Sequence, residues 1–511
     1  MKKRILAVLL LCGMLCAVLS GCGGGSEEQP KGEVTTTRAQ SNEIAVGIAQ
    51  DLDSSLDPHL VVAAGTKEVM FNVFEGLMKP TSTGDLIPAV AEDYEISEDR
   101  LTYTFTLREG VKFHNGDTVA AEDVKYSIDR CADTTDGTPL VEAFSVIQSV
   151  EILDEKTVAI TIAEPSNEFI SYMTTAILPA DYDQQAMAPV GTGPFKFISR
   201  TAQESIVLEK FDEYWGTPAY LDKITYKIIE NAEGLLMGLQ SGALDIVSHL
   251  STTQVAQLGE EFNIVEGTMN LVQALYLNNA EKPFDDVRVR QALCYAIDRQ
   301  QILDIAFDGY GSIINSSIYP AFGKYFAEDM NGYYTVDIEK AKSLLAEAGY
   351  PDGFKMTITV PSNYQPHIDT AQVIVEQLKA VGVTAEIQLV EWESWVSDTY
   401  VGRQFHSTVV GFDASTMTAR ALLERWTTGY GKNMINYRNA EYDELFVQAQ
   451  ASYDDAEQTA LYKEMAKNLT VNAANVYIQD LADLVAVRSG LEGLQFYPIY
   501  VMDLATVRYI D

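Results

Sequence analysis

The feature that most constrains the fold is a strand, a helix and a second strand that follow one another directly between residues 355 and 390. Residues 355–360 and 384–390 read as strands, and residues 364–381 between them read as a helix. Two strands joined through one helix pair in parallel, with a right-handed crossover. This unit therefore predicts an α/β fold.

Other segments carry equally clear signals for helices and strands. Asp286 and Asp337 each stand where a side chain can cap the first turn of an amphipathic helix. Gly349 follows the second of these helices, where a left-handed residue is needed to end it. Residues 101–107 alternate apolar and threonine side chains, which is typical of a half-buried strand.

Length and charge narrow the class of protein. The chain has 511 residues, of which 47% are hydrophobic, and this is enough for roughly two to four domains with sizeable cores. Its 36 Lys and Arg against 73 Asp and Glu give a net charge of −37. Phosphate backbones attract clustered cations, so we expect no nucleic-acid partner.

The N-terminus has the pattern of an exported lipoprotein. A short basic start is followed by an apolar stretch at residues 5–19, which is too short for a comfortable membrane span. Leu19-Ser20-Gly21-Cys22 then resembles a bacterial lipobox, in which the cysteine is lipidated and becomes the first mature residue. We expect a signal peptide at residues 1–21, lipid on Cys22 and a flexible tether at residues 22–41. The protein is then extracytoplasmic and anchored to the cell membrane; an ordinary secretory signal is the alternative.

The remaining cysteines and the histidines indicate neither a metal nor a cofactor. Cys131 and Cys294 fall on predicted helices and are expected to be buried free thiols, with a single disulfide as the alternative. The five histidines show no i,i+4 pair, and the chain has no CxxC motif. We expect no metal site and no cofactor.

Five phrases, in order, resemble the peptide/nickel-type (family 5) extracytoplasmic solute-binding proteins of ABC importers. They include Gly-Thr-Gly-Pro-Phe-Lys-Phe at residues 191–197 and Lys-Pro-Phe-Asp-Asp-Val-Arg-Val-Arg-Gln-Ala-Leu at residues 282–293. The others lie at residues 117–130, 214–224 and 341–354. Each phrase is weak alone, but five in order behind a lipobox are specific. The resemblance covers the chain from about Glu43 to its end.

The resemblance implies two α/β lobes joined by a hinge, with an extra domain inserted in the first lobe. The first lobe would combine residues 42–62, 186–269 and 486–511, around an insertion at 63–185, and the second lobe would be 270–485. It also implies a monomeric binding protein, not an enzyme. Such a protein captures a peptide or peptide-like solute in the interlobe cleft and delivers it to the permease subunits of an ABC transporter.

The segment expected to recognise the ligand departs from the pattern of peptide binders. There a Trp and an Asp follow a strand of the second lobe, and the Asp pairs with the peptide ammonium. The resemblance places Phe412 at the Trp and Ser415 at the Asp. Asp413 is a candidate replacement for the carboxylate, and Arg420 is suited to a ligand carboxylate or phosphate. A structural ion pair or helix cap is the alternative for Asp413 and Arg420.

Three further ligand-binding candidates lie near the ends of predicted strands. Val62 stands in the expected first cleft loop, where some peptide binders carry acidic residues. Tyr364 and Trp395 follow the strands of the first unit described, and aromatic side chains there can form a ligand platform. In the loop before Val62, Asp57 and His59 are expected to shape the backbone.

Several functions stay open at this point. Within solute binding, a carboxylate-rich small molecule or a metal chelate held by Arg420 is the alternative to a peptide. A sensor lipoprotein that signals ligand occupancy is a further possibility. An exported hydrolase has little support, because the sequence has neither a Gly-x-Ser-x-Gly nor a His-Glu-x-x-His motif.

Overall fold

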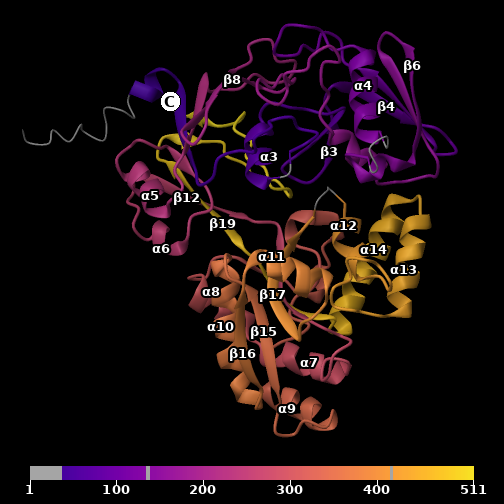
Figure 1. Ribbon diagram of the computed structural model, residues 1–511, viewed down its shortest axis with the longest axis vertical. Helices are drawn as coiled ribbons and strands as arrows, with labels where there is room; N and C mark the ends of the chain where they lie inside the picture. Colours follow the sequence, from indigo (N-terminus) through magenta and orange to yellow (C-terminus); the bar gives the residue numbers. More distant parts are fainter. Residues whose placement is uncertain (1–36, 62, 134–138, 415–417, 511) are drawn as a thin grey trace, which may run out of the picture.

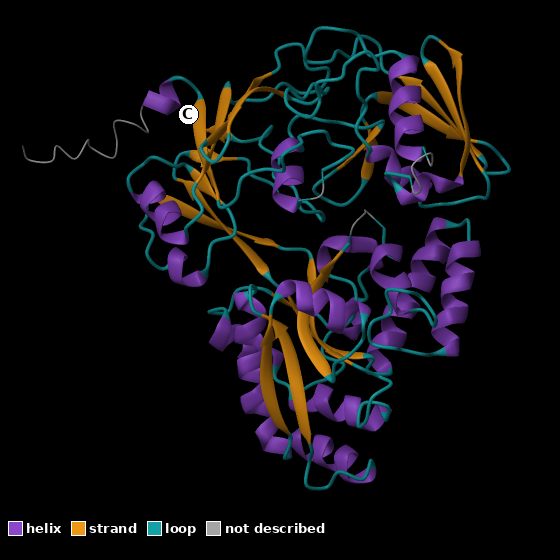
Figure 2. Ribbon diagram, viewed as in Figure 1, coloured by secondary structure: helices purple, strands orange, loops and turns teal. Residues whose placement is uncertain are grey.

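The computed structural model describes residues 37–61, 63–133, 139–414 and 418–510 (Figure 1). The strands form three larger sheets, and Figure 2 shows helices packed on each of them. We use first lobe for the seven-stranded sheet, second lobe for the six-stranded sheet and inserted domain for the four-stranded sheet, each with the elements packed on it. No helix within the described residues is long and apolar enough to cross a membrane.

The first lobe is built on strands from distant parts of the chain. In spatial order its sheet is β12 (Phe262–Thr268), β19 (Ala482–Arg488), β11 (Ile246–Val247), β1 (Glu43–Ile48), β10 (Lys223–Ile228), β9 (Ser205–Lys210) and β8 (Phe195–Thr201). β1 is parallel to both of its neighbours, whereas β19 is antiparallel to both of its own. The remaining elements are α3 (Ala64–Met70), α5 (Ala232–Gln240), α6 (Thr252–Val255) and the hairpin of β20 (Leu491–Glu492) with β21 (Arg508–Tyr509).

The second lobe is a sheet with helices on both faces. Its strand order is β14 (Ser312–Ile313), β18 (Asn475–Asp480), β13 (Leu271–Leu277), β17 (Ser407–Asp413), β15 (Lys355–Pro361) and β16 (Thr384–Val390). Val272 and Tyr276 of β13 enter one core, and Leu275 and Leu277 enter the other. Successive strand residues point to opposite faces, so one buried strand serves two cores.

The second lobe contains the helices from α7 to α14. They are α7 (Val287–Ala296), α8 (Arg299–Ala306), α9 (Ile338–Glu347), α10 (Gln365–Leu378), α11 (Trp392–Ser394), α12 (Arg420–Leu423), α13 (Ala440–Ala451) and α14 (Asp455–Val471). Short helical turns lie at η3 (Pro320–Tyr325), η4 (Glu328–Met330), η5 (Lys379–Val381), η6 (Trp395–Val401) and η7 (Glu424–Trp426).

The inserted domain is an antiparallel sheet with one long helix. Its strand order is β4 (Ala91–Ile96), β5 (Thr102–Leu107), β7 (Thr157–Ile162) and β6 (Ile147–Asp154). Helix α4 (Ala121–Ala132) contributes Val124, Ile128 and Cys131 to its core. The ribbon pair β2 (Met78–Pro80) and β3 (Leu86–Pro88) and the turns η1 (Glu142–Val146) and η2 (Phe169–Thr174) complete it.

The local sequence signals are confirmed where the structure tests them. β15 and β16 pair in parallel around α10, as the first unit predicts. Asp286 and Asp337 accept hydrogen bonds from backbone N–H groups in the first turns of α7 and α9. Gly349 has a φ of 94°, the left-handed conformation expected at the end of α9. Cys131 and Cys294 are buried free thiols, so they form no disulfide with each other.

The boundaries of the two lobes and the inserted domain, judged by which side chains pack together, differ from the residue ranges expected from the sequence. Met70 and Val73, expected in the insertion, pack in the same core as the sheet of the first lobe, and so does Leu178. β19 begins at Ala482, four residues before the expected return to the first lobe at 486. These boundaries depend on which apolar side chains are buried together. The local sequence does not reveal which distant segment covers a given side chain.

The chain passes between the lobes in two adjacent segments. One joins β12 to β13 through Met269 and Asn270, and the other joins β18 to β19 through Leu481. The Met269 N–H donates to the Leu481 carbonyl at 2.8 Å, and the Leu271 N–H donates to the buried Asp480 carboxylate at 2.9 Å. The two crossings are therefore bonded to each other, which makes them a compact hinge.

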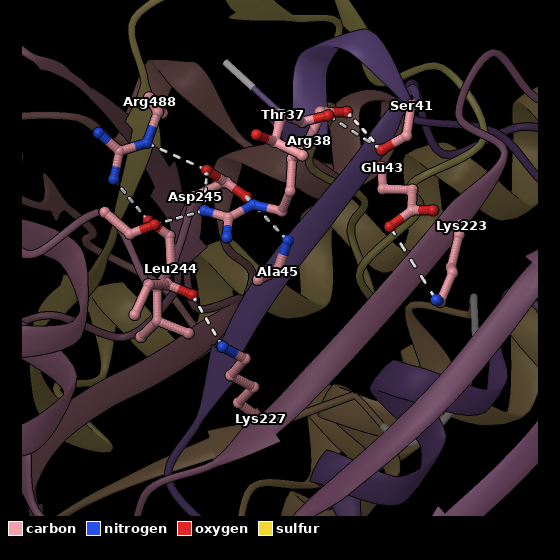
Figure 3. Close-up of polar contacts among 12 residues, drawn as sticks. Thr37, Arg38, Ser41, Glu43, Ala45, Lys223, Lys227, Leu244, Asp245 and Arg488 are labelled. Carbon is pink, nitrogen blue, oxygen red and sulfur yellow. Dashed lines mark hydrogen bonds and ion pairs between the residues drawn. The ribbon is translucent and has the colours of Figure 1, made fainter. Parts of the chain in front are cut away.

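A buried carboxylate joins an early segment and a late segment of the described chain within the first lobe (Figure 3). Asp245 has no exposed surface. Its carboxylate pairs with Arg38 at 2.7 Å and with Arg488 of β19 at 3.0 Å, and it accepts the Ala45 N–H of β1 at 2.8 Å. Arg38 falls inside the range expected to be a flexible tether, but this ion pair holds it against the lobe. Burial of the carboxylate demands partners, and Arg38 supplies one.

We predict that Asp245→Asn strongly destabilises the protein. The amide would leave the buried Arg488 and the part-buried Arg38 without a counter-charge, a change that costs about 3–5 kcal/mol in the free energy of unfolding. Urea unfolding of both proteins measures the difference. The matched control is Asp129→Asn, whose exposed pair with Lys125 is worth less than about 1 kcal/mol. Equal losses in the two variants would contradict the central role of Asp245.

Candidate ligand-binding cavity

A cavity of about 1070 Å³ lies between the second lobe and the rest of the molecule. The first lobe and the inserted domain line it with residues of α3, of the segments 140–146 and 164–176, and of the C-terminal segment 497–505. The second lobe contributes the end of β17, the start of α12 and residues near α13 and α14. The volume lies just above the range of about 300–1,000 Å³ that is usual for small-molecule sites.

The end of β17 carries two of the predicted ligand-binding residues, and they point in different directions. Asp413 is exposed and lines the cavity. Phe412 is half-buried and packs on Tyr276 and Trp426, with ring centroids 5.1 and 6.2 Å away. Neighbouring strand residues face opposite sides, so the sheet that presents Asp413 to the cavity turns Phe412 into the core. The expectation that Phe412 contacts the ligand is therefore not supported by its position.

Two aromatic candidates also lie outside the cavity wall. Trp395 is 2% exposed, stacks between Trp392 and Tyr400, and donates from Nε1 to the Thr408 hydroxyl at 3.0 Å. Tyr364 is exposed, but its ring packs edge-on against Trp392 and lines no part of the cavity. The rings of Tyr364 and Trp395 both pack against Trp392 in an aromatic stack.

Arg420 lies in the cavity wall, but its charge is already balanced. Its guanidinium pairs with Glu424 at 2.8 Å and with Glu168 of the inserted domain at 3.6 Å. Burial alone would lower the pKa of Arg420, but the hydrogen bond to Glu424 and the charge of Glu168 raise it overall. The structural ion pair, left open as an alternative from the sequence, is what the structure contains.

The first cleft loop is held by an ion pair to the inserted domain. Asp57 pairs with Arg130 of α4 at 2.6 Å, and the His59 ring contacts the Ala176 carbonyl at 2.8 Å and Arg130 at 3.1 Å. Burial lowers the pKa of His59, so the ring is neutral near pH 7. Asp57 and His59 therefore shape this loop, as expected. Val62 and Ser415 lie outside the described residues.

An anionic group in the cavity wall was not expected from the sequence. Glu75 is buried and accepts hydrogen bonds from Tyr214 at 2.6 Å and from the Trp215 ring at 2.7 Å, with Lys79 at 3.3 Å. The Tyr-Trp pair was visible only as part of a family phrase. Lys79 is only four residues away, but Tyr214 and Trp215 come from a distant segment, so no local pattern could have revealed the whole cluster.

Potential metal ligands are scattered in the described part of the chain. There, no three His, Cys, Asp or Glu side chains come together in a way that could hold a metal ion. The site has the features of a binding cavity: a large volume, mixed polar and apolar walls, and charged side chains from both lobes.

Comparisons with known proteins agree on one family. The family model for bacterial extracellular solute-binding proteins, family 5, matches residues 85–434. The chain is 30% identical over 445 residues to the glutathione-binding protein GsiB of Escherichia coli O1:K1 / APEC, covering 83% of this chain and 86% of that protein.

Two solved structures with bound ligands have the same fold. The periplasmic binding protein DppA from Helicobacter pylori, in complex with the peptide STSA, has a TM-score of 0.73 at 26% identity, and the match covers 92% of this chain and 98% of that one. AgaA from A. tumefaciens R10, in complex with agropinic acid, has a TM-score of 0.71 at 28% identity, covering 92% and 99%. The two-lobed arrangement is thus that of periplasmic binding proteins.

We predict that Trp395 contributes stability while Tyr364 contributes little. Trp395→Ala removes a buried ring and is expected to lower the free energy of unfolding by about 3–5 kcal/mol. Tyr364→Ala, at an exposed ring, should cost about 1 kcal/mol or less. Urea unfolding checks both. A small loss for Trp395→Ala would contradict the packing described for this stack.

Proposed function

Because this chain belongs to the family 5 bacterial extracellular solute-binding proteins, we propose that it captures a short peptide or peptide-like solute between its lobes and delivers it to an ABC permease for import. The relatives named for glutathione and for a bound peptide support this ligand class. The protein acts by binding and performs no catalysis.

The observation that carries the proposal is the carboxylate of Asp413. It is exposed at the end of β17, it lines the cavity, and it forms no ion pair with any residue that the structure describes. An unpaired carboxylate in a closing cavity is suited to a cationic group of the ligand. Asp413 is therefore proposed as the anchor of the peptide α-ammonium, in place of the carboxylate that the chain lacks at Ser415.

The two alternative ligands fit the cavity less well. A carboxylate-rich ligand held by Arg420 would have to compete with Glu168 and Glu424, which already balance this guanidinium. A metal chelate held by a histidine would need a free ring nitrogen in the wall. The two ring nitrogens of His59 face the Ala176 carbonyl and Arg130 instead.

We further propose that the protein is a monomer anchored to the cell membrane by lipid on Cys22. The lipobox-like residues Leu19-Ser20-Gly21-Cys22 support this, and so does the extracytoplasmic location of the family. Two acyl chains bury enough methylene groups for stable anchoring. The signal peptide and Cys22 lie outside the described residues.

We predict that Asp413→Asn weakens the binding of a free tripeptide by about 10- to 100-fold, the effect of losing one charged hydrogen bond. The same tripeptide with an acetylated N-terminus should bind the unchanged protein just as weakly. Acetylation should then cost little further affinity in the variant, because the two changes remove one interaction. Isothermal titration calorimetry measures all four combinations.

Glu164→Gln provides the control for this cycle. Glu164 is an exposed carboxylate in the same cavity wall, on the inserted domain. Its removal should leave the penalty for acetylation unchanged. If acetylation weakens binding to Asp413→Asn as much as to the unchanged protein, Asp413 does not hold the ammonium.

We predict that Cys22→Ala moves the protein from the membrane fraction of the cell to the soluble fraction, because the thiol that would carry the lipid is gone. Cys16→Ala is the matched control, since Cys16 lies in the segment that the signal peptidase would remove. Fractionation with intact-mass measurement tests both. Persistence of Cys22→Ala in the membrane fraction would contradict lipid anchoring at this residue.

A further inference from the structure

The inserted domain contacts the second lobe directly, apart from the hinge. Arg100 donates to the Tyr453 carbonyl at 2.7 Å, and Asn167 donates to the Ser452 carbonyl at 2.6 Å. Both carbonyls lie in the short connection between α13 and α14. Figure 1 shows these helices beneath the inserted domain, on the side of the molecule away from β12 and β19.

A third contact involves a buried carboxylate. Glu168, next to Asn167, is 7% exposed and enters the second lobe. It accepts a hydrogen bond from the Tyr462 hydroxyl of α14 at 2.9 Å and pairs with Arg420 of α12 at 3.6 Å. Both Glu168 and Arg420 line the ligand cavity, so this contact forms part of its wall.

The three residues act as one unit within the inserted domain. Arg100 donates to the Asn167 side chain at 3.0 Å, and Asn167 and Glu168 are sequence neighbours. The guanidinium of Arg100 also lies over the Tyr453 ring, 5.0 Å from its centroid. The hinge joins the second lobe to the first lobe, and this contact joins it to the inserted domain, which the Asp57–Arg130 pair ties to the first lobe. The cavity lies between the two places. Rotation about the hinge separates the lobes only if this contact breaks.

We propose that Arg100, Asn167 and Glu168 form a latch through which the inserted domain holds the second lobe closed over the cavity, and that Arg420 is its receiving partner. The inference rests on the proposed function only in that closure serves ligand capture. In this assignment Arg420 is a positioning residue that acts on the conformation and does not bind the solute. A few hydrogen bonds of this kind shift a conformational balance without locking it.

The strength of the latch depends on pH, and the direction of this dependence follows from the burial of Glu168. The groups that face Glu168 are Arg420 from α12, Glu424 from η7, Tyr462 from α14 and Tyr325 from η3. Burial raises the pKa of Glu168 to about 7, and the charge of Arg420 offsets this only in part. In the open form Glu168 is hydrated and returns toward its usual range. The closed form therefore binds the proton more tightly, so the latch is firmest in acid and weakens as the pH rises through about 7.

Small-angle X-ray scattering of the ligand-free protein tests the latch without any assumption about the solute. Glu168→Ala should increase the radius of gyration, with the ratio of closed to open molecules lowered about tenfold or more. Glu164→Gln is the matched control: it removes an exposed carboxylate of the same inserted domain that forms none of the latch contacts, so the radius should stay unchanged. A radius for Glu168→Ala equal to that of the unchanged protein would overturn the proposal.

Glu168→Gln tests the proton linkage and guards against misfolding, since the amide matches the protonated acid in shape. The unchanged protein should open between about pH 5 and pH 8.5, whereas Glu168→Gln should stay closed over the same range. The comparison distinguishes the effect of Glu168 from that of Asp480 in the hinge, because Asp480 titrates in both proteins. Equal pH responses in the two proteins would show that Glu168 is not the group whose titration opens the latch. Because no peptide is present, a failure of peptide binding elsewhere leaves these outcomes unaffected.

Discussion

The arrangement of the lobes depends on one buried carboxylate, that of Asp245. It joins Arg38 near the start of the described residues, the backbone of β1 at Ala45, and Arg488 of β19. A carboxylate without exposed surface is tolerated only when its charge and lone pairs are matched, so these three segments must come together for the first lobe to form. The last long strand is thereby fixed to the first lobe, although the residues just before it belong to the second.

This constraint creates the hinge. β18 pairs in the second lobe and β19 in the first, with a single residue, Leu481, between them. At that point Asp480 is buried and bonded to the backbone of Leu271, and burial raises its pKa to about 7. The two crossings are too short to let the lobes separate widely, but the lobes can rotate. Rotation of this kind would open and close the cavity while keeping both of its walls.

The charged side chains of the cavity wall are of two kinds: those paired with other protein groups, and those available to a solute. Glu75, Glu168 and Arg420 each have protein partners at short range and serve the structure of the walls. Asp413 differs because its carboxylate has no ion pair among the residues described. The resemblance to peptide binders predicts that this strand end contacts the ligand. Arg420 is already paired with Glu424 and Glu168, so Asp413 is the charged group at this strand end that we propose as the anchor.

The sequence by itself determined the α/β class, the caps of α7 and α9, the parallel pair around α10 and the family, because caps, periodicity and turn residues act over a few positions. It also found the strand end that carries Asp413. Only the tertiary structure decided that Phe412 and Trp395 face the core, that residues 64–74 pack with the first lobe, and that Glu168 reaches Arg420. Those outcomes depend on which distant segment covers a side chain or balances its charge. Burial and electrostatic pairing are properties of the assembled chain, and no local pattern encodes them.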